Sequence, residues 1–180
     1  MRKIAFTKME GCGNDYVYLD GFSKDLRLTE ADIPALARAI SDRHYGVGSD
    51  GLVLILPPAS PDRADIRMRM FNADGSEAEM CGNASRCVGR FAWEHALTGR
   101  PVIRLETLAG FTTVINTRRQ EEVVAQIRTL IAEHGVERLV LGYPKNMDGT
   151  LGPRAEKCAA LGEILRDATG LPLVLWDERR

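Results

Sequence analysis

The pattern of apolar and polar positions predicts short strands interspersed with amphipathic helices. Runs typical of strands, either alternating or continuously apolar, occur at residues 4–8, 16–20, 52–56, 66–71 and 101–110. Apolar residues at three- and four-residue spacing predict one helix over residues 29–40 and a second between about residues 82 and 99. The first part of the chain is therefore predicted to contain both helices and sheet, the α+β class.

After Gly110 the strands and helices alternate regularly. Helical spacing predicts helices over residues 118–134 and 153–169, and a glycine follows each of them. Three short apolar runs typical of buried strands alternate with these helices, an order that implies parallel pairing through right-handed crossovers. The sequence thus predicts two parts, 1–110 and 111–180, joined near Gly110.

The composition narrows the class of protein only a little. Of the 180 residues, 44% are hydrophobic and 27% are charged, which is ordinary for a globular protein. The formal net charge of -1 gives no global signal for a nucleic-acid or membrane partner. No apolar run approaches the roughly 20 residues that span a bilayer, and the charged start is unlike a signal peptide. We therefore expect a cytoplasmic protein with no membrane partner.

The candidate chemistry centres on Cys81. Turn residues fill positions 72–76, and a helical pattern begins directly after Cys81-Gly82-Asn83. A thiol at a helix N-terminus meets unpaired N–H groups and the positive end of the helix dipole, a setting that favours the thiolate. The alternative is a small buried hydrophobe, the role of most free cysteines. The Asn, Gly and Ser residues around Cys81 favour the reactive thiol.

Three segments resemble, in the same order, the motifs of diaminopimelate epimerases. They are residues 11–16 (GCGNDY), 42–51 (DRHYGVGSDG) and 72–87 (NADGSEAEMCGNASRC). The resemblance covers residues 1–110, with Glu10 standing where the family usually has histidine. It implies a mixed β-sheet around a helix. It also implies a cofactor-independent isomerase that interconverts LL- and meso-2,6-diaminoheptanedioate, a small amino-acid substrate of lysine and peptidoglycan precursor biosynthesis.

The resemblance also implies which residues form the site. Cys81 is one of two catalytic acid/base groups, and the substrate-binding residues are Asn14, Gly51, Asn72, Gly82 and Asn83. Inversion of an α-carbon needs a second acid on the opposite face. The family's second cysteine belongs to a half without a counterpart here, so we expect impaired epimerase activity. Partial domains expose sheet edges, which favours association and makes a homo-oligomer one expectation.

The second part resembles another family. Residues 142–149 (GYPKNMDG) and 176–179 (WDER) resemble the Holliday-junction-resolvase-like family associated with pre-16S rRNA processing, which has an RNase H-like α/β fold with parallel strands. The resemblance covers residues 111–180 but has no counterpart of the family's opening strand and its metal-binding aspartate. It implies an alternative function, a Mg²⁺-dependent nuclease acting on nucleic acid.

Under this alternative Asp177 is the metal ligand, because it ends a strand, and Asp148 and Glu178 are nearby candidates. Without the first aspartate the nuclease is also expected to be impaired. A third alternative is a non-catalytic fusion or truncation product.

Overall fold

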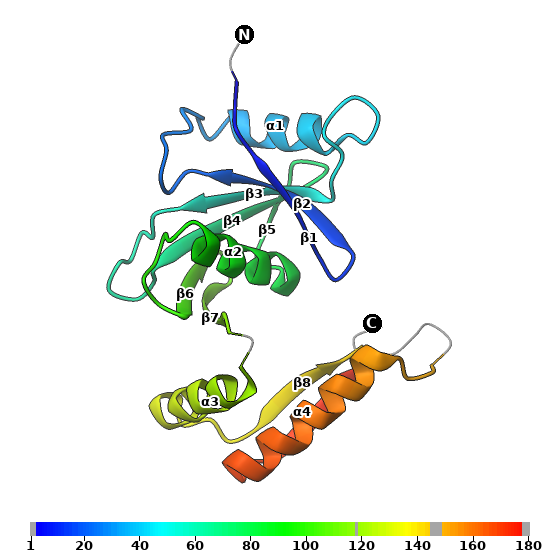
Figure 1. Cartoon of the computed structure of the whole chain (residues 1–180). Helices are drawn as coiled ribbons and strands as arrows, with labels where there is room; N and C mark the ends of the chain where they lie inside the picture. Colours follow the sequence, from blue (N-terminus) through cyan, green and yellow to red (C-terminus); the bar gives the residue numbers. More distant parts are fainter. Residues whose placement is uncertain (1–2, 118, 145–148, 178–180) are drawn as a thin grey trace. The chain divides into compact units, whose positions relative to one another are not determined.

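The chain divides into two units, Met1–Asn116 and Thr117–Arg180 (Figure 1). The computed structural model describes residues 3–117, 119–144 and 149–177. The division falls after Asn116 and not near Gly110, because Gly110 begins a strand that belongs to the first unit. In that strand's hairpin Gly110 lies opposite Thr107 with a φ of 116°, a conformation that favours glycine.

The first unit contains a mixed sheet of seven strands. The order across the sheet is β1-β2-β3-β4-β6-β7, and β5 pairs with β4 as well. The β2–β3 and β4–β6 pairs are parallel and the other pairs are antiparallel. The strands are β1 (Thr7–Gly11), β2 (Asn14–Asp20), β3 (Gly51–Leu56), β4 (Ile66–Asn72), β5 (Glu77–Ala78), β6 (Val102–Thr107) and β7 (Gly110–Ile115).

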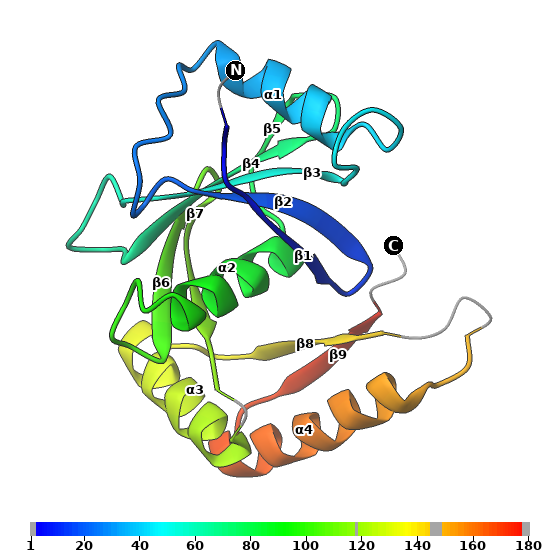
Figure 2. The same cartoon turned by 45° about the horizontal axis from the view of Figure 1, so that its top comes forward.

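Two helices, α1 (Asp32–Ser41) and α2 (Gly82–Glu94), cover opposite faces of this sheet (Figures 1 and 2). Alternation along β2 separates the two cores. Tyr16 and Tyr18 pack with α2, whereas the intervening Val17 and its neighbour Leu19 pack with α1. The predicted α+β class is confirmed.

The helix boundaries differ from the sequence pattern for local reasons. The first helix begins at Asp32, because Thr29 Oγ1 donates a hydrogen bond to Asp32 Oδ2 (2.7 Å) in the preceding turn. The second helix ends at Glu94, well before Gly99, because Ala96 adopts a φ of 51° that the helix cannot continue through. Within residues 3–117, 119–144 and 149–177, no helix has both the length and the apolar character to cross a membrane.

The second unit contains α3 (Gln120–His134), β8 (Leu139–Tyr143), α4 (Pro153–Thr169) and β9 (Leu173–Asp177). Strands β8 and β9 are parallel and α4 connects them, which confirms the predicted parallel pairing for this pair. Gly135 and Gly170 end the two helices, as predicted, and both adopt the left-handed conformation. Strand β7, by contrast, pairs with β6 in the first unit and not with this small sheet.

Candidate functional site

Strand directions bring the predicted substrate-binding residues to one end of the first sheet. Asn14 begins β2 and Gly51 begins β3, which is parallel to β2. Asn72 ends the antiparallel β4 and lies directly opposite Gly51. At the start of α2, which opens with Gly82, Asn83 Nδ2 donates a hydrogen bond to Asn14 Oδ1 (2.9 Å). Residues far apart in the sequence therefore meet where β2 and β3 begin.

Within this group, Gly51 and Asn72 are already tightly engaged. A Cβ at Gly51 would lie 2.1 Å from the carbonyl oxygen of Phe71, so only glycine fits there. Asn72 Nδ2 donates to Ser76 Oγ (3.0 Å) across the turn after β4. Asn72 thus holds the turn that leads to Cys81, in addition to any contact with a ligand.

Cys81 occupies the N-cap position of α2, as the sequence pattern predicts. Its backbone is extended (φ -140°, ψ 119°), and its side chain makes no capping hydrogen bond. The first backbone hydrogen bond of the helix runs from Ser85 N to Cys81 O (2.9 Å). The N–H groups of Gly82, Asn83 and Ala84 therefore have no partner within the helix. A half-buried thiol thus lies beside three N–H groups at a helix N-terminus, a place where an anionic ligand group can bind.

Two tyrosines of β2 face thiols of α2, a feature that the sequence reasoning missed. Burial, and after it the interaction with Cys81, raises the pKa of Tyr16 to about 12. Burial, and after it Cys87, raises the pKa of Tyr18 strongly. The Tyr18 hydroxyl lies beside the Cys87 sulfur but has no partner in good hydrogen-bond geometry among the described residues. The alternating Tyr-Val-Tyr pattern was the available signal, because it places both rings on one face.

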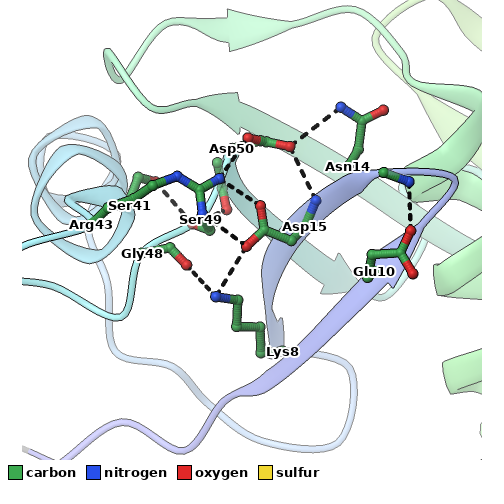
Figure 3. A network of polar contacts seen from close by, with 11 residues as sticks. Lys8, Glu10, Asn14, Asp15, Ser41, Arg43, Gly48, Ser49 and Asp50 are labelled. Carbon is green, nitrogen blue, oxygen red and sulfur yellow. Dashed lines mark hydrogen bonds and ion pairs between the residues drawn. The ribbon is translucent and has the colours of Figure 1, made fainter.

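An ion-pair network lies behind Asn14 and was also missed (Figure 3). Asp15 contacts Arg43 Nη2 (2.7 Å) and Lys8 Nζ (3.0 Å), and Arg43 Nη2 also contacts Asp50 (2.9 Å). Arg43 and then Lys8 lower the pKa of Asp15 from its ordinary 3.8 to about 2. Asp50 Oδ2 accepts hydrogen bonds from Asn14 Nδ2 (3.3 Å) and Asp15 N (3.1 Å). The network therefore connects the β1–β2 hairpin to the segment before β3.

The other cysteines occupy different settings. Cys12 is exposed in the β1–β2 turn, where Arg86 Nη1 donates to its sulfur at 3.3 Å. Cys87 is buried on the same helix that follows Cys81. Cys158 lies on α4 in the second unit. Of the three cysteines in the first unit, Cys81 is the one at the helix N-terminus.

The described part of the second unit does not assemble a metal site. Asp177 ends β9 opposite Tyr143 in register. Asp148 and Glu178 lie outside the described residues. Over residues 3–117, 119–144 and 149–177, no three His, Cys, Asp or Glu side chains are grouped to hold a metal ion. Asp177 is the one of the three candidate ligands that the structure describes, and a Mg²⁺-dependent nuclease would hold its metal ion through several such carboxylates.

Two family models match the chain. The diaminopimelate epimerase model matches residues 6–129, more than half of the chain. The Holliday junction resolvase model matches residues 103–180, less than half. The matches overlap over residues 103–129, from β6 into α3.

Relatives agree with the first match. The chain is 59% identical over 112 residues to the diaminopimelate epimerase of Desulfovibrio desulfuricans, covering 62% of this chain and 36% of that protein. It is 41% identical over 167 residues to the diaminopimelate epimerase of Pelotomaculum thermopropionicum, covering 93% of this chain and 58% of that protein. The chain thus spans 36% and 58% of the length of these curated relatives. Among solved structures, a PhzF-family phenazine biosynthesis protein of Bacillus anthracis aligns with 23% identity and a TM-score of 0.46, over 62% of this chain and 34% of that one.

Proposed function

The chain belongs to the diaminopimelate epimerase family, and on that premise we propose that its first unit carries one half of an amino-acid epimerase site. The proposed substrates are LL- and meso-2,6-diaminoheptanedioate, and no cofactor takes part. The observation that supports this best is Cys81 at the N-terminus of α2, beside the hydrogen-bonded Asn14–Asn83 pair. We also propose a cytoplasmic location, in keeping with a biosynthetic role.

In the proposed reaction the Cys81 thiolate removes the α-proton of the substrate. The α-carboxylate, whose negative charge grows as the proton leaves, is held by the N–H groups of Gly82 and Asn83 at the start of α2. Asn14 and Asn72 hold the remaining polar atoms. Gly51 contacts the substrate through its backbone at the start of β3.

Inversion requires that an acid on the opposite face return the proton. Cys87 is buried along the same helix as Cys81, and Cys12 is bound by Arg86. Cys158 lies on α4 in the second unit. We therefore expect the chain to exchange the α-proton with solvent but to invert the carbon poorly. A thiol that exchanges its proton with D₂O returns deuterium to the face from which it took the proton.

Deuterium exchange at the α-carbon in D₂O tests this proposal. The native chain should incorporate deuterium into diaminopimelate, and Cys81→Ala should not. Cys12→Ser is the matched control, because it removes an exposed thiol nearby and should leave the exchange intact. The absence of exchange in the native chain would contradict the proposed function. Robust formation of the other stereoisomer would contradict the expectation that the chain lacks a second acid.

A second candidate function is a metal-dependent nuclease, with the second unit as a partial RNase H-like fold. The observation that favours it is the match of the resolvase model to residues 103–180. Asp177 would be one Mg²⁺ ligand, and the partner would be a branched DNA or a precursor of 16S rRNA. Mg²⁺-dependent cleavage by the native chain, lost in Asp177→Asn, would support it. If neither exchange nor cleavage is detected, the third alternative, a non-catalytic chain, is the one that remains.

A further inference from the structure

Asp50 determines which way the Asn14 side chain is oriented. A carboxylate only accepts hydrogen bonds, so the Asn14 group that faces Asp50 Oδ2 at 3.3 Å must be the NH₂ group. The Asn14 oxygen is therefore directed to the other side, where it meets the Asn83 side chain. The group of Asn83 that contacts this oxygen at 2.9 Å must in turn be its NH₂ group.

The hydrogen bonds that join these three side chains all run in one direction and end at one acceptor oxygen. Asn83 donates to Asn14, and Asn14 donates to Asp50. The amide nitrogens of both asparagines are thus turned inward, which leaves Asn83 Oδ1 as the terminal acceptor. Among the described residues, no hydrogen bond to Asn83 Oδ1 is formed. The pair therefore presents an oxygen at the start of α2.

Asp50 is itself held from several directions, so the polarity is fixed by charge. Arg43 Nη2 contacts Asp50 Oδ1 at 2.9 Å, and Asp15 N donates to Asp50 Oδ2 at 3.1 Å. Asp50 N donates to Asp15 O at 2.7 Å in return. Arg43 also pairs with Asp15, which Lys8 contacts from the neighbouring strand (Figure 3). An Asp50 carboxylate so restrained keeps its acceptor oxygen facing Asn14.

We propose that Asp50 is a positioning residue that sets the polarity of the Asn14–Asn83 pair, so that the site offers an acceptor oxygen to the ammonium group of an amino-acid ligand. An ammonium group carries only donors and matches Asn83 Oδ1. A carboxylate carries only acceptors and matches the free N–H groups of α2. The two charged groups on one α-carbon then bind at distinct places, and a reversed pair would present an NH₂ group to the ammonium. The identity of the ligand rests on the proposed function, whereas the orientation of the pair does not.

The orientation is tested without ligand by ¹⁵N-edited NMR of the asparagine side chains. Asp50→Asn keeps the shape but can itself donate, so the side-chain NH₂ resonances of Asn14 and Asn83 should both shift. Asp65→Asn is the matched control, because Asp65 also accepts from an arginine guanidinium (2.8 Å) and a backbone N–H (2.9 Å), both of Arg104. It should leave those resonances in place. Unchanged resonances in a folded Asp50→Asn variant would overturn the proposal.

The consequence for recognition is tested by comparing two ligands. Diaminopimelate and heptanedioate are the same dicarboxylate with and without the amino groups. The native chain and Asp65→Asn should bind diaminopimelate about tenfold more tightly, the usual size of one hydrogen bond to a charged group, and Asp50→Asn should lose most of this preference. Equal binding of both ligands by the native chain would overturn the ammonium assignment.

A second variant covers the case in which Asp50→Asn does not fold. Asn83→Ala removes the terminal acceptor and leaves the contact between Asn14 and Asp50 intact. It should therefore lose the preference for diaminopimelate, as Asp50→Asn does. A retained preference in Asn83→Ala would overturn the proposal. If the native chain binds neither ligand, the proposed function fails, and the NMR comparison still decides the orientation.

Discussion

Removing the negative charge of Asp15 should lower the free energy of unfolding of the first unit by about 1 kcal/mol at neutral pH and by almost nothing near pH 2. Arg43, and after it Lys8, lowers the pKa of Asp15 from 3.8 to about 2. At about 1.36 kcal/mol per pKa unit, this shift corresponds to at most about 2.4 kcal/mol. The Asp15 and Arg43 side chains are 20% and 56% exposed. Solvent screening therefore reduces the contribution to about 1 kcal/mol.

The direction of this pH dependence follows from the numbers of protons that the folded and unfolded states bind. The unfolded chain protonates Asp15 near its ordinary pKa of 3.8, whereas the folded chain does so only near about 2. Between these two values the unfolded state binds more protons, so the stability contributed by Asp15 rises with pH. It is fully present above about pH 5 and is lost as the pH falls from about 4 to about 2. Asp15→Asn cannot ionise and lacks this contribution at every pH.

Urea unfolding at a series of pH values measures the difference. Trp93 reports on the first unit, and a Trp176→Phe background removes the signal of the second unit. Adding Arg43→Gln completes a double-mutant cycle, whose coupling should be a part of the Asp15 contribution at pH 7 and should vanish toward about pH 2. A difference between the native chain and Asp15→Asn that is equal at both ends of the pH range would refute the ion-pair reasoning.

Three further predictions concern packing and ionisation in the same unit. Gly51→Ala places a methyl group 2.1 Å from the Phe71 carbonyl oxygen and should lower the free energy of unfolding by about 2 kcal/mol or more in the same urea assay. Gly82→Ala is the control, because a methyl group there has nothing within 4 Å, and it should change the free energy of unfolding by less than about 0.5 kcal/mol. Arg69 is 14% exposed and contacts two glutamates at 2.7 Å each, so Arg69→Met should cost about 1–2 kcal/mol, and an unchanged urea midpoint would contradict these contacts. The absorbance titration of the native chain minus that of Tyr16→Phe should show a tyrosine ionising at a pKa of about 12, because burial and then Cys81 disfavour the phenolate. A step near pH 10, the ordinary range of tyrosine, would contradict that environment.

Local sequence signals predicted the helices and strands. Which unit a strand joins depends on its pairing with residues far away in the sequence, and local signals do not specify that pairing. The start of α2 directly after Cys81, and the extent of α4 from Pro153 to Thr169, follow from turn residues, helical spacing and a terminal glycine. The placement of β7 does not follow from such local signals, because a glycine such as Gly110 is compatible with both a domain boundary and a hairpin turn. The pairing of β7 with β6 shows that Gly110 lies in a hairpin turn and not at a domain boundary.

The ion-pair network depends on pairing in the same way. Lys8 and Asp15 come together through the β1–β2 hairpin, and Arg43 and Asp50 reach them because β2 and β3 are parallel neighbours. Their charges are ordinary in the sequence, since surface residues of both signs are common. The register of three strands, which no local pattern specifies, turns them into a support for Asn14.

Under the proposed function, the first unit separates recognition from inversion. Its helix N-terminus provides donors for a carboxylate, and under the proposed orientation Asn83 provides an acceptor for an ammonium group, so both charged groups of one α-carbon have a place. In the proposed reaction Cys81 serves only one face of that carbon. Binding and proton exchange should consequently belong to the first unit, while inversion needs an acid from elsewhere. The ratio of deuterium incorporation to stereoisomer formation thus distinguishes an assembled half-site from a complete enzyme. A half-site exchanges the proton without inverting the carbon, so the ratio is high, whereas a complete two-base site brings the ratio toward one.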